Sequence, residues 1–124
     1  MAFNNWGYAL NKLGKYEEAI EKLEIAIKIN PKYDRPYNHL GVALTGLGEY
    51  KDAIEKFEIS IALNAKRDDV YLNWGEALRK LKESQPELYA TEVEEFKKVL
   101  EANKEIKELK ESEDFQKIYQ EFMK

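Results

Sequence analysis

The fold is decided by the stretch Tyr37–Asn64, which reads YNHLGVALTGLGEYKDAIEKFEISIALN. A near-copy stands 34 positions earlier at Phe3–Asn30, with the sequence FNNWGYALNKLGKYEEAIEKLEIAIKIN. The first half returns 34 positions later as YLNWGEAL at Tyr71–Leu78. A fixed period of this length is typical of architectures in which one supersecondary unit is repeated. We therefore expect a stack of similar units.

Each copy has the pattern of two helices joined by a short turn. Apolar residues in the first half recur at three and four positions and share one helical face, as do Phe3, Trp6, Leu10 and Leu13. A glycine lies in the middle of each first helix, at Gly7, Gly41 and Gly75. Glycine there costs roughly 1 kcal/mol relative to alanine, which is understandable if a second helix crosses too closely for a side chain. Small residues for that crossing are present on the second helices, at Ala19 and Ala53.

The pattern predicts helices over about 2–13, 16–29, 35–47, 50–63 and 69–82. Another should begin near Pro86, since proline is favoured in the first turn, and end near Asn103. Asn103 follows Asn64 by 39 positions instead of 34, so five extra residues lie between Leu81 and Tyr89. We interpret them as a longer loop that decorates the fold; the alternative is a binding loop. Glu92 and Val99 replace the small alanines here, which predicts looser packing in the third hairpin.

The two ends of the chain depart from the repeat. Five residues near the C-terminus fall on one helical stripe: Phe115, Ile118, Tyr119, Phe122 and Met123. Ser112 and the acidic residues after it indicate a helix start. We expect this helix to cover the open end of the third hairpin; the alternative is that it lies in a concave groove. At the other end, Met1 abuts the first repeat without a polar cap, so we expect either a truncated chain or an end that packs on another molecule.

The repeat resembles the tetratricopeptide repeat (TPR), whose pattern is an aromatic, Leu-Gly, a second aromatic, then Ala, Phe and a late Pro. The copies match it with Trp6-Gly7, Leu40-Gly41 and Trp74-Gly75, and with Tyr16 and Tyr50. The resemblance implies an all-α, right-handed α-solenoid of three helical hairpins plus a C-terminal capping helix. The hairpins would span about 3–34, 37–68 and 71–104, within a repeat region 1–104, and the amphipathic cap would span 105–124.

Composition limits the kinds of partner. The net charge is -4 and the pI about 5.2, which argues against a nucleic-acid partner. No apolar run approaches the ~18 residues that a membrane span requires, and no signal peptide is present. The chain has no cysteine, which fits a cytoplasmic setting.

Residues suited to catalysis are few. His39 is the only histidine, with no metal-ligand spacing around it, and the three serines lie at a packing position or at expected turns. No phosphate-binding glycine loop follows a strand. We therefore predict no enzyme activity, no metal and no cofactor.

In TPR folds the first helix of each hairpin lines a concave groove, and the resemblance implies groove residues by position. In the first repeat these are Asn4, Asn5, Tyr8, Asn11 and Lys12. In the second they are Arg35, Asn38, His39, Val42, Thr45 and Gly46. In the third they are Asp69, Leu72, Asn73, Glu76, Arg79 and Lys80.

Asn5, His39 and Asn73 form one column, which resembles the asparagine ladder of a TPR groove except at its middle position. Such amides can pair with the backbone of an extended peptide; the alternative is that they are solvated polar residues. The carboxylate clamp of TPR co-chaperones is absent, because the matching places hold Asn4, Tyr8, His39, Asp69 and Asn73.

We predict a protein-interaction module that binds a peptide or partner helix in the groove. The alternative is a self-assembling domain, a homo-oligomer formed through the N-terminal hairpin and the stripe at 115–123.

Overall fold

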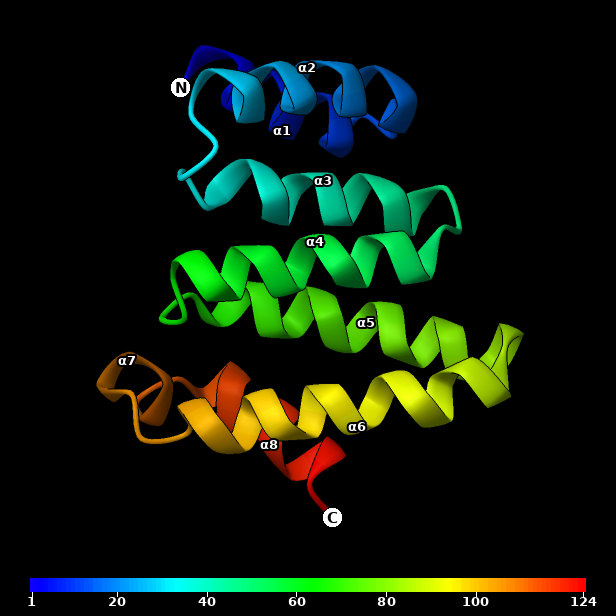
Figure 1. Ribbon diagram of the computed structural model, residues 1–124, viewed down its shortest axis with the longest axis vertical. Coiled ribbons are helices and arrows are strands. Elements are labelled where there is room, and N and C mark those ends of the chain that lie inside the picture. Colours follow the sequence, from blue (N-terminus) through cyan, green and yellow to red (C-terminus); the bar gives the residue numbers. More distant parts are fainter. The chain divides into compact units, whose positions relative to one another are not determined.

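The computed structural model describes all residues from Met1 to Lys124 and contains eight helices and no strand. The chain divides into two compact units, Met1–Asn64 and Ala65–Lys124, each of which is described by itself (Figure 1). The all-α class predicted from the repeat is confirmed. The right-handed curvature expected for the whole stack stays a prediction.

Unit 1 consists of two helical hairpins. Its helices are α1 (Ala2–Lys12), α2 (Tyr16–Ile29), α3 (Arg35–Gly46) and α4 (Tyr50–Leu63). Both hairpin turns use glycine in the left-handed region, with φ of 75° at Gly14 and 81° at Gly48. In the first turn the Lys15 N–H donates to the Leu10 carbonyl at 2.9 Å, which is the Schellman pattern that ends a helix. The sequence therefore predicted every helix end in this unit to within one residue.

The helices of each unit 1 hairpin cross closely at the central glycine, as expected, but the nearest side chains are those of Leu23 and Phe57 and not the expected alanines Ala19 and Ala53. A Cβ added at Gly7 would lie 2.4 Å from Leu23 of α2, and one at Gly41 would lie 2.4 Å from the ring of Phe57 of α4. The large side chain of the second helix thus fills the space beside the glycine. Ala19 of α2 is fully buried in the same hairpin.

The tyrosines at the start of the second and third copies each donate a hydrogen bond to the turn that precedes them. The hydroxyl of Tyr37 donates to the Pro31 carbonyl at 2.8 Å, and the hydroxyl of Tyr71 donates to the Ala65 carbonyl at 2.8 Å. Burial raises the pKa of Tyr71, so its phenol remains a proton donor. The tyrosine that begins the second and the third copy therefore has a hydrogen-bonding role as well as a packing role.

Unit 2 contains α5 (Asp68–Ser84), α6 (Pro86–Asn103), α7 (Lys107–Lys110) and α8 (Glu113–Phe122). The longer loop predicted between Leu81 and Tyr89 is wrong, because Gln85 alone separates α5 from α6. The five extra residues lengthen the two helices instead, and Pro86 opens α6 as predicted. The short helix α7 was not predicted.

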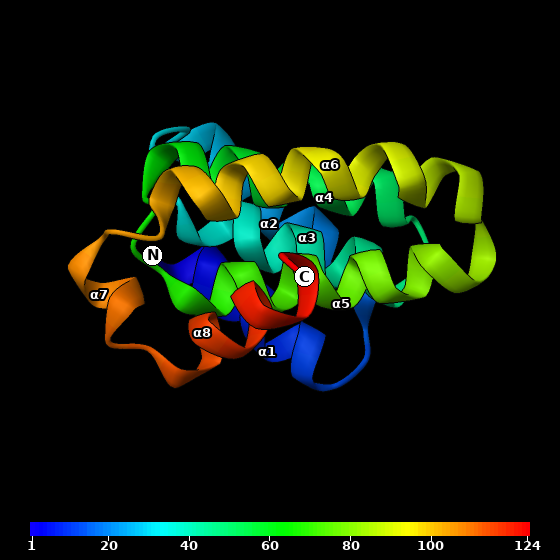
Figure 2. The same cartoon turned by 90° about the horizontal axis from the view of Figure 1, so that it is seen from below.

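The C-terminal helix packs against α5, and Figure 2 shows the two side by side. A Cβ at Gly75 would lie 3.0 Å from Ile118 and 3.3 Å from Phe122, both on α8, whereas none of its nearest atoms belongs to α6. The space that α2 and α4 fill beside Gly7 and Gly41 is thus filled by α8 in unit 2. This agrees with the looser packing that Glu92 predicted for the third hairpin.

Aromatic rings form the core of unit 2. The ring of Phe115 meets that of Tyr71 edge-on with centroids 5.0 Å apart, and Phe122 meets Phe96 in the same way at 5.0 Å. Phe96 also contacts Trp74 at 4.8 Å. The predicted stripe on α8 is therefore an integral part of this core.

Candidate functional site: the first-helix surfaces

Four of the predicted groove residues in unit 1 are buried and offer little surface to a partner. They are Asn4, Asn11, Asn38 and His39, each less than a tenth exposed. Asn4 and Asn11 are seven positions apart and share one face of α1. Asn11 on that face meets α3, because its Nδ2 donates to the His39 carbonyl at 2.9 Å. His39, the middle residue of the expected polar column, is likewise buried, at 6% exposed.

A smaller set of predicted residues in unit 1 does reach the surface. Asn5, Tyr8 and Lys12 on α1 are exposed, and Arg35, Val42 and Thr45 on α3 are half-buried. The Thr45 hydroxyl donates to the Gly41 carbonyl at 2.8 Å, so its proton is engaged within the helix. A side chain at Gly46 would collide with the ring of Tyr16, whose atoms lie 2.5 Å from the place of a Cβ.

Tyr8 is the largest exposed side chain of this set, and its ring is held from two sides. It packs on the imidazole of His39 with ring centroids 5.0 Å apart, and Lys12 Nζ lies over it at 5.2 Å from the centroid. Because His39 is buried and fixed on α3, it orients the tyrosine without entering the surface itself. We name the exposed set Asn5, Tyr8 and Lys12 of α1, together with the half-buried Val42 of α3, the Tyr8 face.

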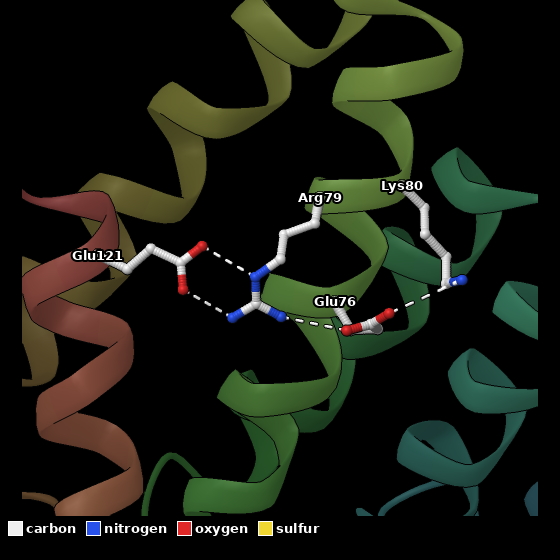
Figure 3. Close-up of polar contacts among 4 residues, drawn as sticks. All are labelled: Glu76, Arg79, Lys80 and Glu121. Atoms are coloured by element: carbon white, nitrogen blue, oxygen red, sulfur yellow. Dashed lines mark hydrogen bonds and ion pairs between the residues drawn. The ribbon is translucent and has the colours of Figure 1, made fainter.

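The predicted residues of unit 2 form a charged group on α5. Leu72, Asn73 and Asp69 are half-buried, whereas Glu76, Arg79 and Lys80 are exposed. Glu76 pairs with Arg79 at 3.1 Å and with Lys80 at 3.7 Å. Figure 3 shows that the fourth member comes from α8, since Arg79 also contacts Glu121.

The Arg79–Glu121 contact is bidentate. Arg79 Nε donates to Glu121 at 2.9 Å and Nη2 donates at 2.7 Å. This pairing lowers the pKa of Glu121 and raises the pKa of Arg79. The sequence indicated Arg79 but missed Glu121, because only the fold brings α8 to this position.

The position of α8 bears on the two interpretations of the C-terminal helix. Phe115, Ile118 and Phe122 are buried in the core of unit 2, as a covering helix would require. Glu121 also binds Arg79, one of the predicted groove residues. The stripe is thus not an exposed surface, and a head-to-tail contact through it would require α8 to leave α5.

One cavity of about 360 Å³ lies in unit 2. It is lined by Lys104, Glu105, Lys110, Phe115, Gln116 and Tyr119. Lys110 pairs with Glu105 at 3.3 Å, and Lys104 pairs with Glu101, which also accepts from the Tyr119 hydroxyl at 2.8 Å. Each lysine is matched by a carboxylate, so the cavity offers no excess charge to an ionic ligand.

The groups needed for a metal site do not come together in this chain. No three His, Asp or Glu side chains gather as metal ligands, and His39 lies against Tyr8 on the α1–α3 contact. None of the eight helices combines the length and the apolar character needed to span a bilayer.

Comparison with known proteins identifies the repeat. Residues 7–48 match the family model described as TPR repeat. No curated protein sequence matches the chain.

Solved structures share the fold over nearly the whole chain. The first TPR of Spaghetti (RPAP3), bound to the HSP90 peptide SRMEEVD, is similar with a TM-score of 0.72 and 20% identity, over 98% of this chain and 88% of that one. The second TPR domain of human RPAP3, in complex with the HSP70 peptide SGPTIEEVD, has a TM-score of 0.72 and 17% identity, over 98% and 92%. The Yersinia enterocolitica type III secretion chaperone SycD, in complex with a peptide of the translocator YopD, has a TM-score of 0.69 and 18% identity, over 98% and 90%.

Proposed function

We propose that this tetratricopeptide-repeat chain is a protein-interaction module that binds a peptide or a partner helix on the Tyr8 face of unit 1. In this proposal the chain acts by binding and has no catalytic role. We place it in the cytoplasm on the composition argument given above.

The proposal rests on two properties of Tyr8, the exposure of its side chain and the fixed orientation of its ring. Its side chain is 46% exposed, yet His39 and Lys12 restrict its ring. Tyrosine is enriched among residues that dominate binding energies, and a ring that is already oriented loses little conformational entropy when a partner covers it. Few other exposed residues on α1 or α3 combine apolar area with a hydrogen-bonding group.

The surroundings of Tyr8 indicate the chemistry of the partner segment. Lys12 supplies a positive charge, Asn5 supplies both a donor and an acceptor, and Val42 supplies apolar area on α3. An extended peptide that places an apolar side chain on Tyr8 and its backbone near Asn5 fits this arrangement. Peptide complexes of the structurally similar TPR domains support a peptide as ligand. The positions of the carboxylate clamp are not basic here, so an acidic C-terminal tail is not the expected ligand.

The test begins with capture of partners by the intact chain and their identification by mass spectrometry. The binding segment of a candidate is then titrated against the wild type, Tyr8→Ala and Ile29→Ala. Ile29 is a matched control because it is an exposed apolar residue on α2. We expect the Kd to be at least tenfold higher for Tyr8→Ala and unchanged for Ile29→Ala. The melting temperatures of the two variants should be equal. Equal affinity for the two variants would remove the Tyr8 face from the proposal.

A further inference from the structure

The cavity in unit 2 lies where the end of α6, the short helix α7 and the helix α8 come together (Figure 1). Its volume of about 360 Å³ falls at the lower end of the roughly 300–1,000 Å³ that is usual for small-molecule sites. The residues around it combine two lysines, a carboxylate, an amide and two aromatic rings, namely Lys104, Glu105, Lys110, Phe115, Gln116 and Tyr119. We name it the α7 cavity.

Hydrogen bonds and an ion pair hold the walls of the α7 cavity in place. The Tyr119 hydroxyl on α8 donates to Glu101 of α6 at 2.8 Å, and Lys104 pairs with the same carboxylate. The hydrogen bond to Glu101 raises the pKa of Tyr119, so its side chain stays a neutral phenol. Gln116 Nε2 donates to the Leu109 carbonyl at 3.3 Å, which ties α8 to α7. The three helices are thus linked around the cavity without the help of a ligand.

One side of the α7 cavity is aromatic. Phe115 is fully buried at its base, and the half-buried ring of Tyr119 lies next to it with centroids 6.3 Å apart. A third ring placed on Tyr119 would continue this arrangement at the separation of about 4.5–7 Å that aromatic pairs prefer. This side of the cavity therefore suits a ligand that presents an aromatic ring.

The charges at the rim of the α7 cavity are loosely paired. Lys110 Nζ lies 3.3 Å from a carboxylate oxygen of Glu105, and these side chains are 57% and 76% exposed. An ion pair this exposed is weak, because water screens it. A ligand that carries both an ammonium and a carboxylate can insert between the two groups and give each of them a new partner. A ligand with a single charge would satisfy one group and leave the other without its counterion.

We propose that the α7 cavity binds a free aromatic amino acid as its zwitterion. The ring of the ligand lies on Tyr119, its carboxylate lies against Lys110, and its ammonium lies against Glu105. The ligand has no net charge, which matches a cavity whose lysines are each balanced by a carboxylate. The site belongs to unit 2 and shares no residue with the Tyr8 face.

The test titrates L-phenylalanine into the isotope-labelled intact chain and follows the backbone amide signals by NMR. Three related compounds each lack one feature of the ligand. N-acetyl-L-phenylalanine has no ammonium, L-phenylalanine amide has no carboxylate, and L-alanine has no ring. We expect L-phenylalanine to cause saturable shifts at the amides of Glu105, Lys110 and Gln116, and each related compound to bind at least fivefold more weakly.

Two lysine variants separate the α7 cavity from general effects of charge. Lys110→Gln removes the proposed contact with the ligand carboxylate and should raise the Kd of L-phenylalanine at least fivefold. Lys117→Gln is the matched control, because Lys117 is an exposed lysine of α8 that does not line the cavity, and it should leave the Kd unchanged. Both lysines are exposed, so both variants should fold, and the dispersion of their amide signals verifies this.

Three results would overturn the proposal. One is the lack of any saturable shift near the α7 cavity at millimolar L-phenylalanine. Another is equal affinity for L-phenylalanine and its N-acetyl derivative, since the ring alone would then account for binding. The last is an equal Kd in Lys110→Gln and the wild type. Tyr8 is unchanged in all these chains, so the outcome is independent of partner binding at the Tyr8 face.

Discussion

The guanidinium of Arg79 on α5 holds the carboxylate of Glu121 on α8 through two hydrogen bonds, of 2.9 and 2.7 Å. The two residues are 42 positions apart, and this is the ion pair that fixes the C-terminal helix against a surface predicted to line a groove. Both side chains are about two-fifths exposed, so solvent screens the pair.

Loss of this pair should weaken the docking of α8 modestly. We expect Arg79→Ala and Glu121→Ala each to lower the free energy of unfolding by about 0.5–1 kcal/mol, the upper end for exposed pairs, because the geometry is bidentate. The double variant should lose less free energy of unfolding than the sum of the two single losses, and urea denaturation measures this difference. Lys80→Ala is the control, since its contact with Glu76 is longer at 3.7 Å and we expect a smaller effect. Additive single effects would mean that the pair contributes nothing.

The same pair makes stability depend on pH in a defined direction. The hydrogen bonds from Arg79 lower the pKa of Glu121 below its ordinary value of 4.5. A carboxylate with a lowered pKa contributes stability above its unfolded pKa, and that contribution is lost as the pH falls through the lower, folded value. Wild type should therefore be more stable than Glu121→Gln at pH 7, and the difference should shrink as the pH drops below about 4.5. Urea midpoints of both proteins between pH 7 and 3 provide the check. A difference that grows toward acid would contradict the assignment.

The hairpins of unit 1 could be predicted from sequence because local signals determine them. Gly14 and Gly48 occupy left-handed positions that other residues rarely adopt, and the helices end there for that reason. The loop predicted near Gln85 failed for an equally local reason. The residues from Leu81 to Ser84 are compatible with a helix and simply extend α5, so the extra residues did not need a loop.

The candidate surfaces were harder to predict, because they depend on which side of a helix its neighbours cover. Asn4 and Asn11 are polar, yet α3 covers their face of α1. The family resemblance placed both residues in the groove by position, and the structure shows that a polar side chain at such a position can be buried at a helix contact. The position of Glu121 beside Arg79 is a nonlocal contact that no spacing in the sequence indicates.

The central glycines should differ in their tolerance of alanine. In Gly41→Ala the new Cβ would lie 2.4 Å from the ring of Phe57, which is fully buried and cannot move away. We expect a loss of about 1–3 kcal/mol in the free energy of unfolding, typical of overpacking. In Gly75→Ala the nearest atom is the terminal Cδ1 of Ile118 at 3.0 Å, and a small shift there can be offset by the roughly 1 kcal/mol gain in helix propensity. Chemical denaturation should thus find Gly41→Ala clearly destabilised and Gly75→Ala nearly neutral. Equal losses would show that α8 packs on Gly75 as rigidly as Phe57 packs on Gly41.

Ser112 should be the most sensitive polar residue at the start of α8. Its hydroxyl oxygen accepts from the Phe115 N–H at 3.0 Å as an N-cap, and the hydroxyl donates to Asp68 at the start of α5 at 2.7 Å. Ser112→Ala removes both contacts, and we expect a loss of about 1–2 kcal/mol in the free energy of unfolding. Ser84→Ala is the matched control, because the Ser84 hydroxyl only donates to the Lys80 carbonyl within an exposed helix end, and little change is expected there. Hydrogen exchange should show faster opening of the amides of α8 in Ser112→Ala while those of unit 1 are unchanged. If the two serine variants lose the same stability, the cap does not anchor α8, and its attachment to α5 rests on the buried Phe115, Ile118 and Phe122 and on the Arg79–Glu121 pair.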